Sequence, residues 1–297
     1  MNHIKDQIRC GAAYRLGLTG KGIGVAVLDT GIFLHRDFDS RVTGFADMVN
    51  GKNFAYDDCG HGTHICGIIG GSGRMSGGRY SGIAPGCDLV MVKVLDRKGN
   101  GYPSDVLAGI SWILERKEKL GIRILNISVG ACSKRGMSEN SALVKGVNRA
   151  WDAGLVVVVA AGNNGPRTMS ITTPGISRKV ITVGCSDDDR EVLVGGNRMV
   201  DYSGRGPTAA CICKPDLVAP GCSVVSCAGR ADKYTIKSGT SMSTPIVSGA
   251  TALLLERYPD MTNKDVKLKL RESCTDIGLP RNQQGWGLLD VERLVSK

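Results

Sequence analysis

Three short segments of this chain carry the side chains of a hydrolytic site. Asp29 lies in the segment VLDTG, His61 opens HGTH, and Ser241 stands in GTSMSTP. A serine hydroxyl is a poor nucleophile at neutral pH until a neighbouring imidazole takes its proton, and a carboxylate holds that imidazole in the correct tautomer. A carboxylate, an imidazole and a hydroxyl, each set among small residues, therefore predict a serine hydrolase.

The order Asp, His, Ser and the residues around each of them resemble the signatures of the subtilisin-like serine proteases, from about Gly20 to the end of the chain. The joint match is specific, whereas DTG alone also occurs in aspartic proteases, which need a pair of aspartates. The resemblance implies a serine endopeptidase, most like the intracellular bacterial branch of the family. It assigns Ser241 as the nucleophile that forms an acyl-enzyme, His61 as general base and then acid, and Asp29 as the residue that orients His61.

Ser241 begins a stretch rich in Ala, Leu and Val that predicts a buried helix as far as Tyr258, with Pro245 in its first turn. The amino terminus of a helix directs its positive end and its free N–H groups, here that of Ser241, toward a developing oxyanion. The resemblance adds a second oxyanion donor, the side chain of Asn163 in the segment VAAGNNG, with Asn164 at the rim. The alternative for Asn163 is an ordinary turn, which Asn-Asn-Gly also favours.

Two further segments, residues 99–102 and 128–131, resemble the strands with which the family binds its substrate. An extended peptide held between two strand edges gains main-chain hydrogen bonds that do not depend on its sequence, while pockets select side chains. We therefore expect broad specificity for peptides and unfolded proteins, with ordinary loop edges as the alternative. The substrate-binding residues that the resemblance implies are Gly99, Asn100, Gly101, Tyr102, Ser128, Val129, Gly130, Ala131, Ala160, Ala161 and Gly162.

Apolar runs bounded by glycine or charge predict five buried parallel strands. They cover residues 24–28, 89–95, 122–127, 155–160 and 180–183. Helical patterns alternate with these runs, which predicts an α/β fold with a doubly wound, mostly parallel central sheet flanked by helices. The expected helix caps are Ser104, Ser138 or Ser141, and Thr262 with Asp265 in a capping box. Asp29 directly follows the first strand, at the sheet edge where such folds carry their sites.

Four potential zinc ligands lie within eight residues, namely Cys59, His61, His64 and Cys66. Their spacing differs from that of structural zinc sites, and HGTH lacks the glutamate of the zinc-protease helix, so a zinc hydrolase is the minor alternative. His64 is expected to be a packed structural histidine. Because Cys66 follows His61 on the same predicted helix, bulky thiol reagents are expected to inhibit the protein.

Calcium is the metal that the resemblance to secreted members of the family brings into question. Asp37 matches an early aspartate of their strong calcium site, but the loop RMSGGRYS at residues 74–81 offers neither a carboxylate nor an asparagine and carries two arginines. Calcium prefers several oxygen ligands, and arginine opposes its binding. We expect this site to be absent and no cofactor to be required, while calcium elsewhere stays open.

The composition argues against several partners and locations. The net charge is +10, but the basic residues are dispersed, which disfavours a nucleic-acid partner, and no apolar run is long enough to span a membrane. The first fifteen residues, MNHIKDQIRCGAAYR, lack an apolar leader, and eleven cysteines without a pairing frame favour reduced thiols. A cytoplasmic protein is therefore expected.

The length of 297 residues, without a linker-like stretch, predicts a single catalytic domain. Residues 1–19 would form an amino-terminal extension and residues 20–297 the catalytic core. The oligomeric state stays open. A second function also stays open, that of a relative that binds peptides or processes one of them with little general proteolysis.

Overall fold

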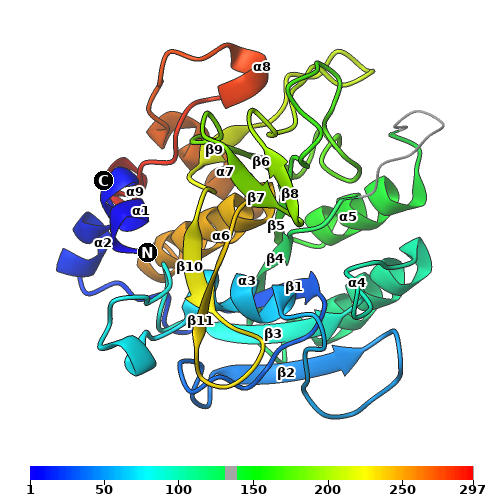
Figure 1. Ribbon diagram of the computed structural model, residues 1–297, viewed down its shortest axis with the longest axis vertical. Coiled ribbons are helices and arrows are strands. Elements are labelled where there is room, and N and C mark those ends of the chain that lie inside the picture. The colour runs from blue at the N-terminus through cyan, green and yellow to red at the C-terminus, as the bar shows by residue number, and fades with distance from the viewer. Residues whose placement is uncertain (131–138, 297) are drawn as a thin grey trace.

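A parallel sheet forms the centre of the computed structural model, which describes residues 1–130 and 139–296. Seven strands run in the order β2-β3-β1-β4-β5-β6-β9 (Figure 1). They are β1 (Gly24–Asp29), β2 (Val42–Asp47), β3 (Asp88–Lys93), β4 (Ile122–Ile127), β5 (Val156–Ala160), β6 (Ile181–Cys185) and β9 (Leu217–Ala219). Two antiparallel ribbons accompany the sheet, β7 (Val192–Val194) with β8 (Asn197–Met199) and β10 (Val224–Cys227) with β11 (Tyr234–Lys237).

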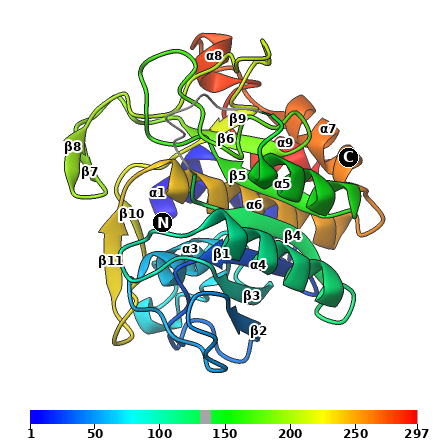
Figure 2. The ribbon, with the colours of Figure 1, turned by 90° about the vertical axis from the view of Figure 1, so that its right-hand side faces the viewer.

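Helices cover both faces of this sheet. They are α1 (Asn2–Gln7), α2 (Gly11–Arg15), α3 (His61–Gly70), the 3-10 helix η1 (Arg74–Ser76), α4 (Pro103–Arg116), α5 (Ala142–Asp152), α6 (Thr240–Arg257), α7 (Asn263–Ser273), α8 (Arg281–Gln284) and α9 (Val291–Val295). In β3, Met91 lies against α3, whereas the next residue, Val92, lies against α4. Helices α3 and α6 therefore pack together on one face, and α4 and α5 on the other, which is in front in Figure 2.

The five strands that the apolar runs predict are all present, and the expected fold class is confirmed. Observed bounds differ from the expected ones by at most two residues. The sequence pattern missed β2 and β9, which lie at the two edges of the sheet. β2 is only half-buried and β9 has three residues, so neither has the continuous apolar run of a central strand.

Helix α6 is buried along most of its length. Every residue from 242 to 255 is buried, as expected for a helix that is apolar or small all round. Pro245 is the sixth residue of α6 and not part of its first turn, because the helix begins at Thr240. Proline has no N–H, so the carbonyl of Ser241 receives no helical hydrogen bond from this position.

Two of the expected helix caps are confirmed. The hydroxyl of Thr262 accepts from the N–H of Asp265 at 3.2 Å, and the carboxylate of Asp265 accepts from the N–H of Thr262 at 2.9 Å. Ser141 caps α5 through its hydroxyl, while its alternative, Ser138, lies outside the described residues. Ser104 is not a cap, because α4 begins one residue before it.

The amino-terminal segment packs against the same core as the sheet. Met1, Ile4 and Ile8 are buried in the hydrophobic cluster that contains the central strands. The carbonyl of Ile8 accepts from the N–H of Val291 at 2.8 Å, so the two ends of the chain lie on one side of the molecule (Figure 1). No helix among the described residues has the length and apolar character needed to cross a membrane.

Candidate active site

Asp29 and His61 meet at the carboxyl-terminal edge of the sheet. Asp29 is the last residue of β1 and fully buried, and His61 is the first residue of α3. The Nδ1 atom of His61 lies 2.7 and 2.9 Å from the two carboxylate oxygens of Asp29. Gly60 precedes His61 with φ of 84°, a left-handed conformation that favours glycine and turns the chain sharply into the helix.

Asp57, which no motif of the sequence singles out, builds the turn that presents His61. One of its carboxylate oxygens accepts from the N–H of Gly60 at 2.7 Å and from the hydroxyl of Thr30 at 2.9 Å. The other accepts from the N–H and the hydroxyl of Thr63, at 2.9 and 2.6 Å. Asp57 therefore caps α3 in place of Gly60 and ties its first turn to the residue after Asp29. An aspartate four residues before a histidine at a helix start is the signal that could have found it.

Lys93 is a second supporting residue that no motif of the sequence singles out. It ends β3, which pairs with β1 so that Lys93 lies beside Asp29, and its side chain is fully buried. Its ammonium group donates to the carbonyls of Thr30 and Leu95, at 2.6 and 2.8 Å, and to the carboxylate of Asp58 at 2.7 Å. A buried ammonium is tolerated because each donor has a partner. Lys93 thereby joins the end of β1 to the loop before His61.

Ser241 lines the same cleft as His61 and is the second residue of α6. Its hydroxyl donates to the carbonyl of Ser128 at 2.7 Å. In this rotamer the proton of Ser241 therefore points to the main chain and not to the ring of His61. The backbone N–H of Ser241 lies in the first turn of the helix, where N–H groups have no helical acceptor.

Asn163 lines the cleft together with Ser241 and His61. Its side-chain oxygen accepts from the N–H and the hydroxyl of Thr240, at 3.0 and 2.9 Å. Those two hydrogen bonds hold the amide in one orientation and use its oxygen, which leaves the amide nitrogen as the group that can act on a ligand. Asn164 lines the cleft beside Asn163, as a rim residue would.

The implied substrate-binding residues in the described part of the chain fall into three groups. Six of them line the cleft with His61 and Ser241, namely Gly99, Ser128, Val129, Gly130, Ala160 and Gly162. Asn100 and Gly101 line an adjoining apolar cavity of about 240 Å³ with Val129 and Gly130. Tyr102, which is 75 % exposed before α4, and Ala161, which is buried, line neither. Ala131 lies outside the described residues, and residues 99–102 and 128–130 form loops and no regular strand.

The two histidines of HGTH serve different partners. Burial lowers the pKa of His61, but the charge and hydrogen bond of Asp29 outweigh burial and raise that pKa above 6.5. His64 is fully buried, and its Nε2 lies 3.1 and 3.2 Å from the carbonyls of Val224 and Thr235, in β10 and β11. Burial lowers the pKa of His64 to about 3, so its ring is neutral. His64 is thus the structural histidine expected, and the two rings do not converge on a zinc site.

The expectation for thiol reagents changes with the structure. Cys66 is fully buried, and burial raises the pKa of its thiol well above 9.0, so a bulky reagent cannot reach a reactive form. The expected inhibition through Cys66 is therefore wrong. Cys59, two residues before His61, is exposed and lines the cleft.

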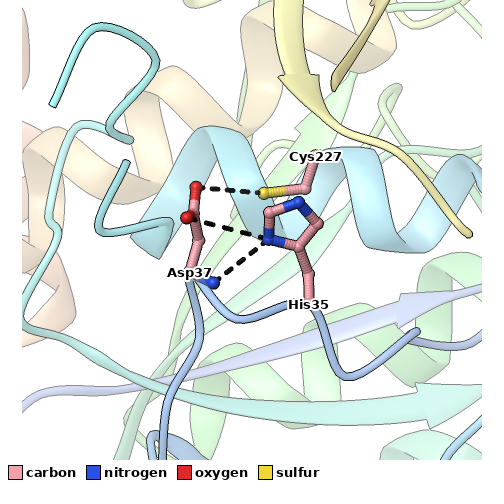
Figure 3. Close-up of side chains that lie close together, drawn as sticks. All are labelled: His35, Asp37 and Cys227. Carbon is pink, nitrogen blue, oxygen red and sulfur yellow. Dashed lines mark hydrogen bonds and ion pairs between the residues drawn. The ribbon is translucent and has the colours of Figure 1, made fainter. Parts of the chain in front are cut away.

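Asp37 is the residue that matches a calcium ligand of secreted members of the family, and its carboxylate here accepts hydrogen bonds from protein groups. Its carboxylate accepts from the N–H of Met75 at 2.9 Å, from the hydroxyl of Tyr234 at 2.7 Å and from the thiol of Cys227 at 3.7 Å. The ring of His35 lies against the same carboxylate, at 3.8 Å (Figure 3). A thiol, a ring nitrogen and a saturated carboxylate do not fit calcium, which needs several free oxygen ligands.

The β7–β8 hairpin and β11 form a further wall of the cleft, which was not predicted from the sequence. The β7–β8 hairpin contributes Leu193 and Met199, and β11 contributes Ile236 and Lys237, to a cavity of about 580 Å³ that His61 and Ser241 share. Leu193 and Ile236 are 62 and 63 % exposed. The turn Gly-Gly between two apolar runs, in VLVGGNRMV, is the signal of this hairpin.

Comparisons with known proteins agree with this geometry. Residues 20–287 match the model of the subtilase family. Serine protease AprX of Bacillus subtilis (strain 168) is 42 % identical over 313 residues, which cover 99 % of this chain and 70 % of that protein. Subtilisin Savinase of Lederbergia lenta is 34 % identical over 287 residues, covering 97 % of this chain and 96 % of Savinase.

Solved structures show the same likeness. Sphericase superposes with a TM-score of 0.79 at 31 % sequence identity, covering 92 % of this chain and 93 % of its own. A cold-adapted subtilisin-like serine proteinase gives a TM-score of 0.75 at 29 % identity, covering 92 and 90 %. With the family model spanning most of the chain and a seven-stranded parallel sheet of the same fold, this chain belongs to the subtilase family and is a serine endopeptidase.

Proposed function

We propose that this protease cleaves peptides and unfolded proteins through an acyl-enzyme on Ser241, with His61 as base and Asp29 as its orienting partner. The contact of His61 Nδ1 with both oxygens of Asp29, in a cleft that Ser241 and Asn163 also line, carries the proposal. Because Nδ1 donates its proton to Asp29, Nε2 keeps the lone pair that can accept a proton from Ser241.

The reaction starts when the hydroxyl of Ser241 turns from the carbonyl of Ser128 toward His61. His61 takes the proton as the oxygen attacks the scissile carbonyl carbon, and a tetrahedral intermediate forms. His61 then gives this proton to the leaving amine, which departs as the acyl-enzyme forms. A water molecule repeats the two steps, with His61 again as base and then acid, and releases the new carboxyl end.

The oxyanion of the intermediate would lie between the amide nitrogen of Asn163 and the backbone N–H of Ser241. Both groups are held before substrate arrives, Asn163 by Thr240 and Ser241 by the first turn of α6. Fixed donors need no reorganisation as charge develops. For the corresponding asparagine of subtilisin, loss of the donor raises the barrier by about 2.7 to 4 kcal/mol.

Broad specificity is the second part of the proposal. Gly99 and Gly130 are among the cleft residues, and they can offer main-chain groups to an extended peptide without a side chain in the way. The apolar cavity beside them would take a side chain of the substrate. A peptide library with randomised positions on both sides of the cut should show cleavage at many sequences, with a preference for apolar residues in the cavity.

Labelling with a fluorophosphonate tests the nucleophile. The unaltered protein should incorporate one label per chain and hydrolyse denatured casein, and Ser241→Ala should do neither. Ser243→Ala is the matched control, because Ser243 is buried in the same helix and its hydroxyl has no hydrogen-bond partner. Labelling that persists in Ser241→Ala would refute the assignment. Labelling without hydrolysis of casein would favour a relative that processes one peptide, and the absence of both would favour a relative that only binds peptides.

We further propose that neither activity nor stability depends on calcium bound at Asp37. The hydrogen bonds of Asp37 with Met75, Tyr234 and Cys227 support this, since they already satisfy its carboxylate. Calcium added to the metal-free protein should shift the melting temperature and the peptidase rate equally in the unaltered protein and in Asp37→Asn. A stabilisation by calcium that Asp37→Asn abolishes would contradict the proposal.

A reducing compartment, such as the cytoplasm, suits the thiols. The cysteines in the described part of the chain are free, and several are buried in the core. Buried thiols behave as small apolar side chains and persist where disulfides are not formed. Cell fractionation with an antibody to the chain tests this location, and recovery from the culture medium would contradict it.

A further inference from the structure

A second cluster of reactive side chains lies outside the active site, at the carboxyl end of β6. Cys185 is the last residue of β6, Asp187 lies two residues further along the chain, and Cys222 lies three residues after β9, the strand that pairs with β6. One ligand atom of each residue, two sulfurs and a carboxylate oxygen, lies within 4.8 Å of the others. The mechanism proposed above uses none of the three.

Short hydrogen bonds connect these residues to one another. The thiol of Cys185 donates to the carboxylate of Asp187 at 3.1 Å, and the thiol of Cys222 donates to the main-chain carbonyl of Asp187 at 2.7 Å. The buried hydroxyl of Tyr202 lies 3.2 Å from the sulfur of Cys185 and 3.1 Å from that of Cys222. The two sulfurs thus lie close to the same polar groups, namely the hydroxyl of Tyr202 and the oxygens of Asp187.

The backbone around the cluster is held in place without a ligand. The carboxylate of Asp187 accepts from the N–H groups of Gly221 and Cys222, at 2.7 and 3.1 Å. The N–H of Cys185 donates to the hydroxyl of Ser203 at 2.9 Å. Cys185 is 1 % exposed and Cys222 is 8 % exposed, so both cysteines of the cluster are shielded from solvent. A ligand would therefore meet preformed positions.

Two thiolates and a carboxylate are the ligand types that zinc and similar soft divalent cations prefer. We propose that Cys185, Asp187 and Cys222 bind one such cation. On binding, the cation replaces the two thiol protons, which leave to solvent, and two metal–sulfur bonds and one metal–oxygen bond form without any change of oxidation state. A water molecule takes the fourth position, and the hydroxyl of Tyr202 donates to a thiolate, as second-layer groups commonly do.

The other cluster of potential ligands suits a metal less well. In it the Nδ1 atom of His35 already accepts from the N–H of Asp37 at 3.1 Å, and the carboxylate of Asp37 has three donors. Only one thiol is present there, that of Cys227 (Figure 3). The carboxylate of Asp187 also accepts from three protein donors, so the difference between the clusters lies in their sulfurs. Two thiols at Cys185 and Cys222 make that cluster the stronger site for a soft cation.

The position of the cluster indicates what a bound cation would do. The carbonyl of Gly221 accepts from the N–H of Gly239, two residues before Ser241, at 3.0 Å. Val194 and Met199 of the β7–β8 hairpin pack against the same cluster and also line the cleft. A cation there would join β6, the segment before Ser241 and the hairpin, and would act as a structural clamp beside the active site.

Cadmium and cobalt(II) are the probes for this site, because their bonds to thiolates absorb in the near ultraviolet. The test uses the full chain with Ser241→Ala to prevent self-cleavage and a phosphine reductant to keep thiols reduced. Serine replaces the cysteines that are exposed or lie outside the described residues, namely Cys59, Cys132, Cys211 and Cys213. We expect one cadmium per chain, a thiolate charge-transfer band and a higher melting temperature with metal.

Single variants assign the ligands. Cys185→Ser and Cys222→Ser keep the size and hydrogen bonding of the thiol, and each should abolish the band and the rise in melting temperature. Cys227→Ser is the matched control, a buried cysteine of the other cluster, and should retain both. Near-ultraviolet circular dichroism checks that each variant folds. If only one of Cys185→Ser and Cys222→Ser folds, that variant alone is sufficient to test the proposal. The absence of a band in the parent protein, or a band that survives in the folded variant, overturns the proposal.

Discussion

At the scale of single residues, the site depends on how Asp29 acts on His61. Burial alone would lower the pKa of His61 and leave its ring a weak base, whereas the Asp29 carboxylate at 2.7 and 2.9 Å outweighs burial and raises it. A stronger base accepts the proton of Ser241 more readily, but it is also protonated at a higher pH. Activity should therefore fall as the pH drops through a pKa above 6.5.

Asp29→Asn tests this balance. Loss of the negative charge lowers the pKa of His61, so the acid limb of kcat/KM should move to lower pH. The neutral amide also favours the wrong tautomer, and kcat should fall by about 10⁴-fold, the size of loss seen for this residue in subtilisin and related triads. The measurement is a pH profile of the peptidase rate for both proteins. An acid limb that stays in place would contradict the role of Asp29.

Cys59 gives a second prediction at this scale. Cys59 is an exposed residue of the cleft, but partial burial of its thiol and the nearby carboxylates raise the pKa of that thiol. Modification should therefore be slow at pH 7 and faster at pH 9. A bulky maleimide should then block the cleft and inhibit the unaltered protein, while Cys59→Ser should resist. Peptide mass mapping should find Cys66 unmodified. Equal inactivation of Cys59→Ser would show that another thiol matters.

At the scale of elements, most helix boundaries follow local chemistry. The capping box of Thr262 and Asp265 could be predicted because its two partners are three residues apart. Helix α4 differs, since Pro103 starts the helix before Ser104 can cap it. The turn before α3 depends on Asp57, whose contacts reach Thr30 in another segment. Local sequence signals therefore predict helix caps well, but they do not predict side chains such as Asp57 that hold a turn through contacts with a distant segment.

Thr262→Ala should test the contribution of the capping box. The variant loses the bond to the N–H of Asp265 at the start of α7, so the free energy of unfolding should fall by about 1 kcal/mol. Because α7 does not line the cleft, kcat/KM at low temperature should stay unchanged. Thr262→Ser, which keeps the hydroxyl, is the control. Chemical denaturation measures the change, and a loss of the same size in both variants would contradict the capping role.

At the scale of the whole molecule, the amino-terminal segment contributes to stability through the core. Ile8 is fully buried, and its main chain bonds to Val291 at the other end of the chain. Ile8→Ala should lower the free energy of unfolding by about 2 to 5 kcal/mol, and Ile8→Val by about 0.5 to 1.5 kcal/mol. The peptidase rate well below the melting temperature should not change. A loss of activity without a loss of stability would assign this segment a different role.

The sequence by itself determined the chemistry and the class of fold. The segments around Asp29, His61 and Ser241 were readable because each has small residues at fixed spacing, and the central strands because a buried parallel strand is apolar on both faces. Those signals are local, so they can be recognised without knowing which residues lie nearby in space.

Only the tertiary structure decided which distant residues support and surround the site. Lys93 lies in a run that the sequence predicts as a buried strand, but the partners of its ammonium group could not be predicted, because they depend on the pairing of β3 with β1. The wall formed by the β7–β8 hairpin and β11, and the pairing of Cys185 with Cys222, likewise join segments far apart in the chain. Such contacts depend on how strands are ordered in the sheet, and that order follows from the packing of the whole molecule.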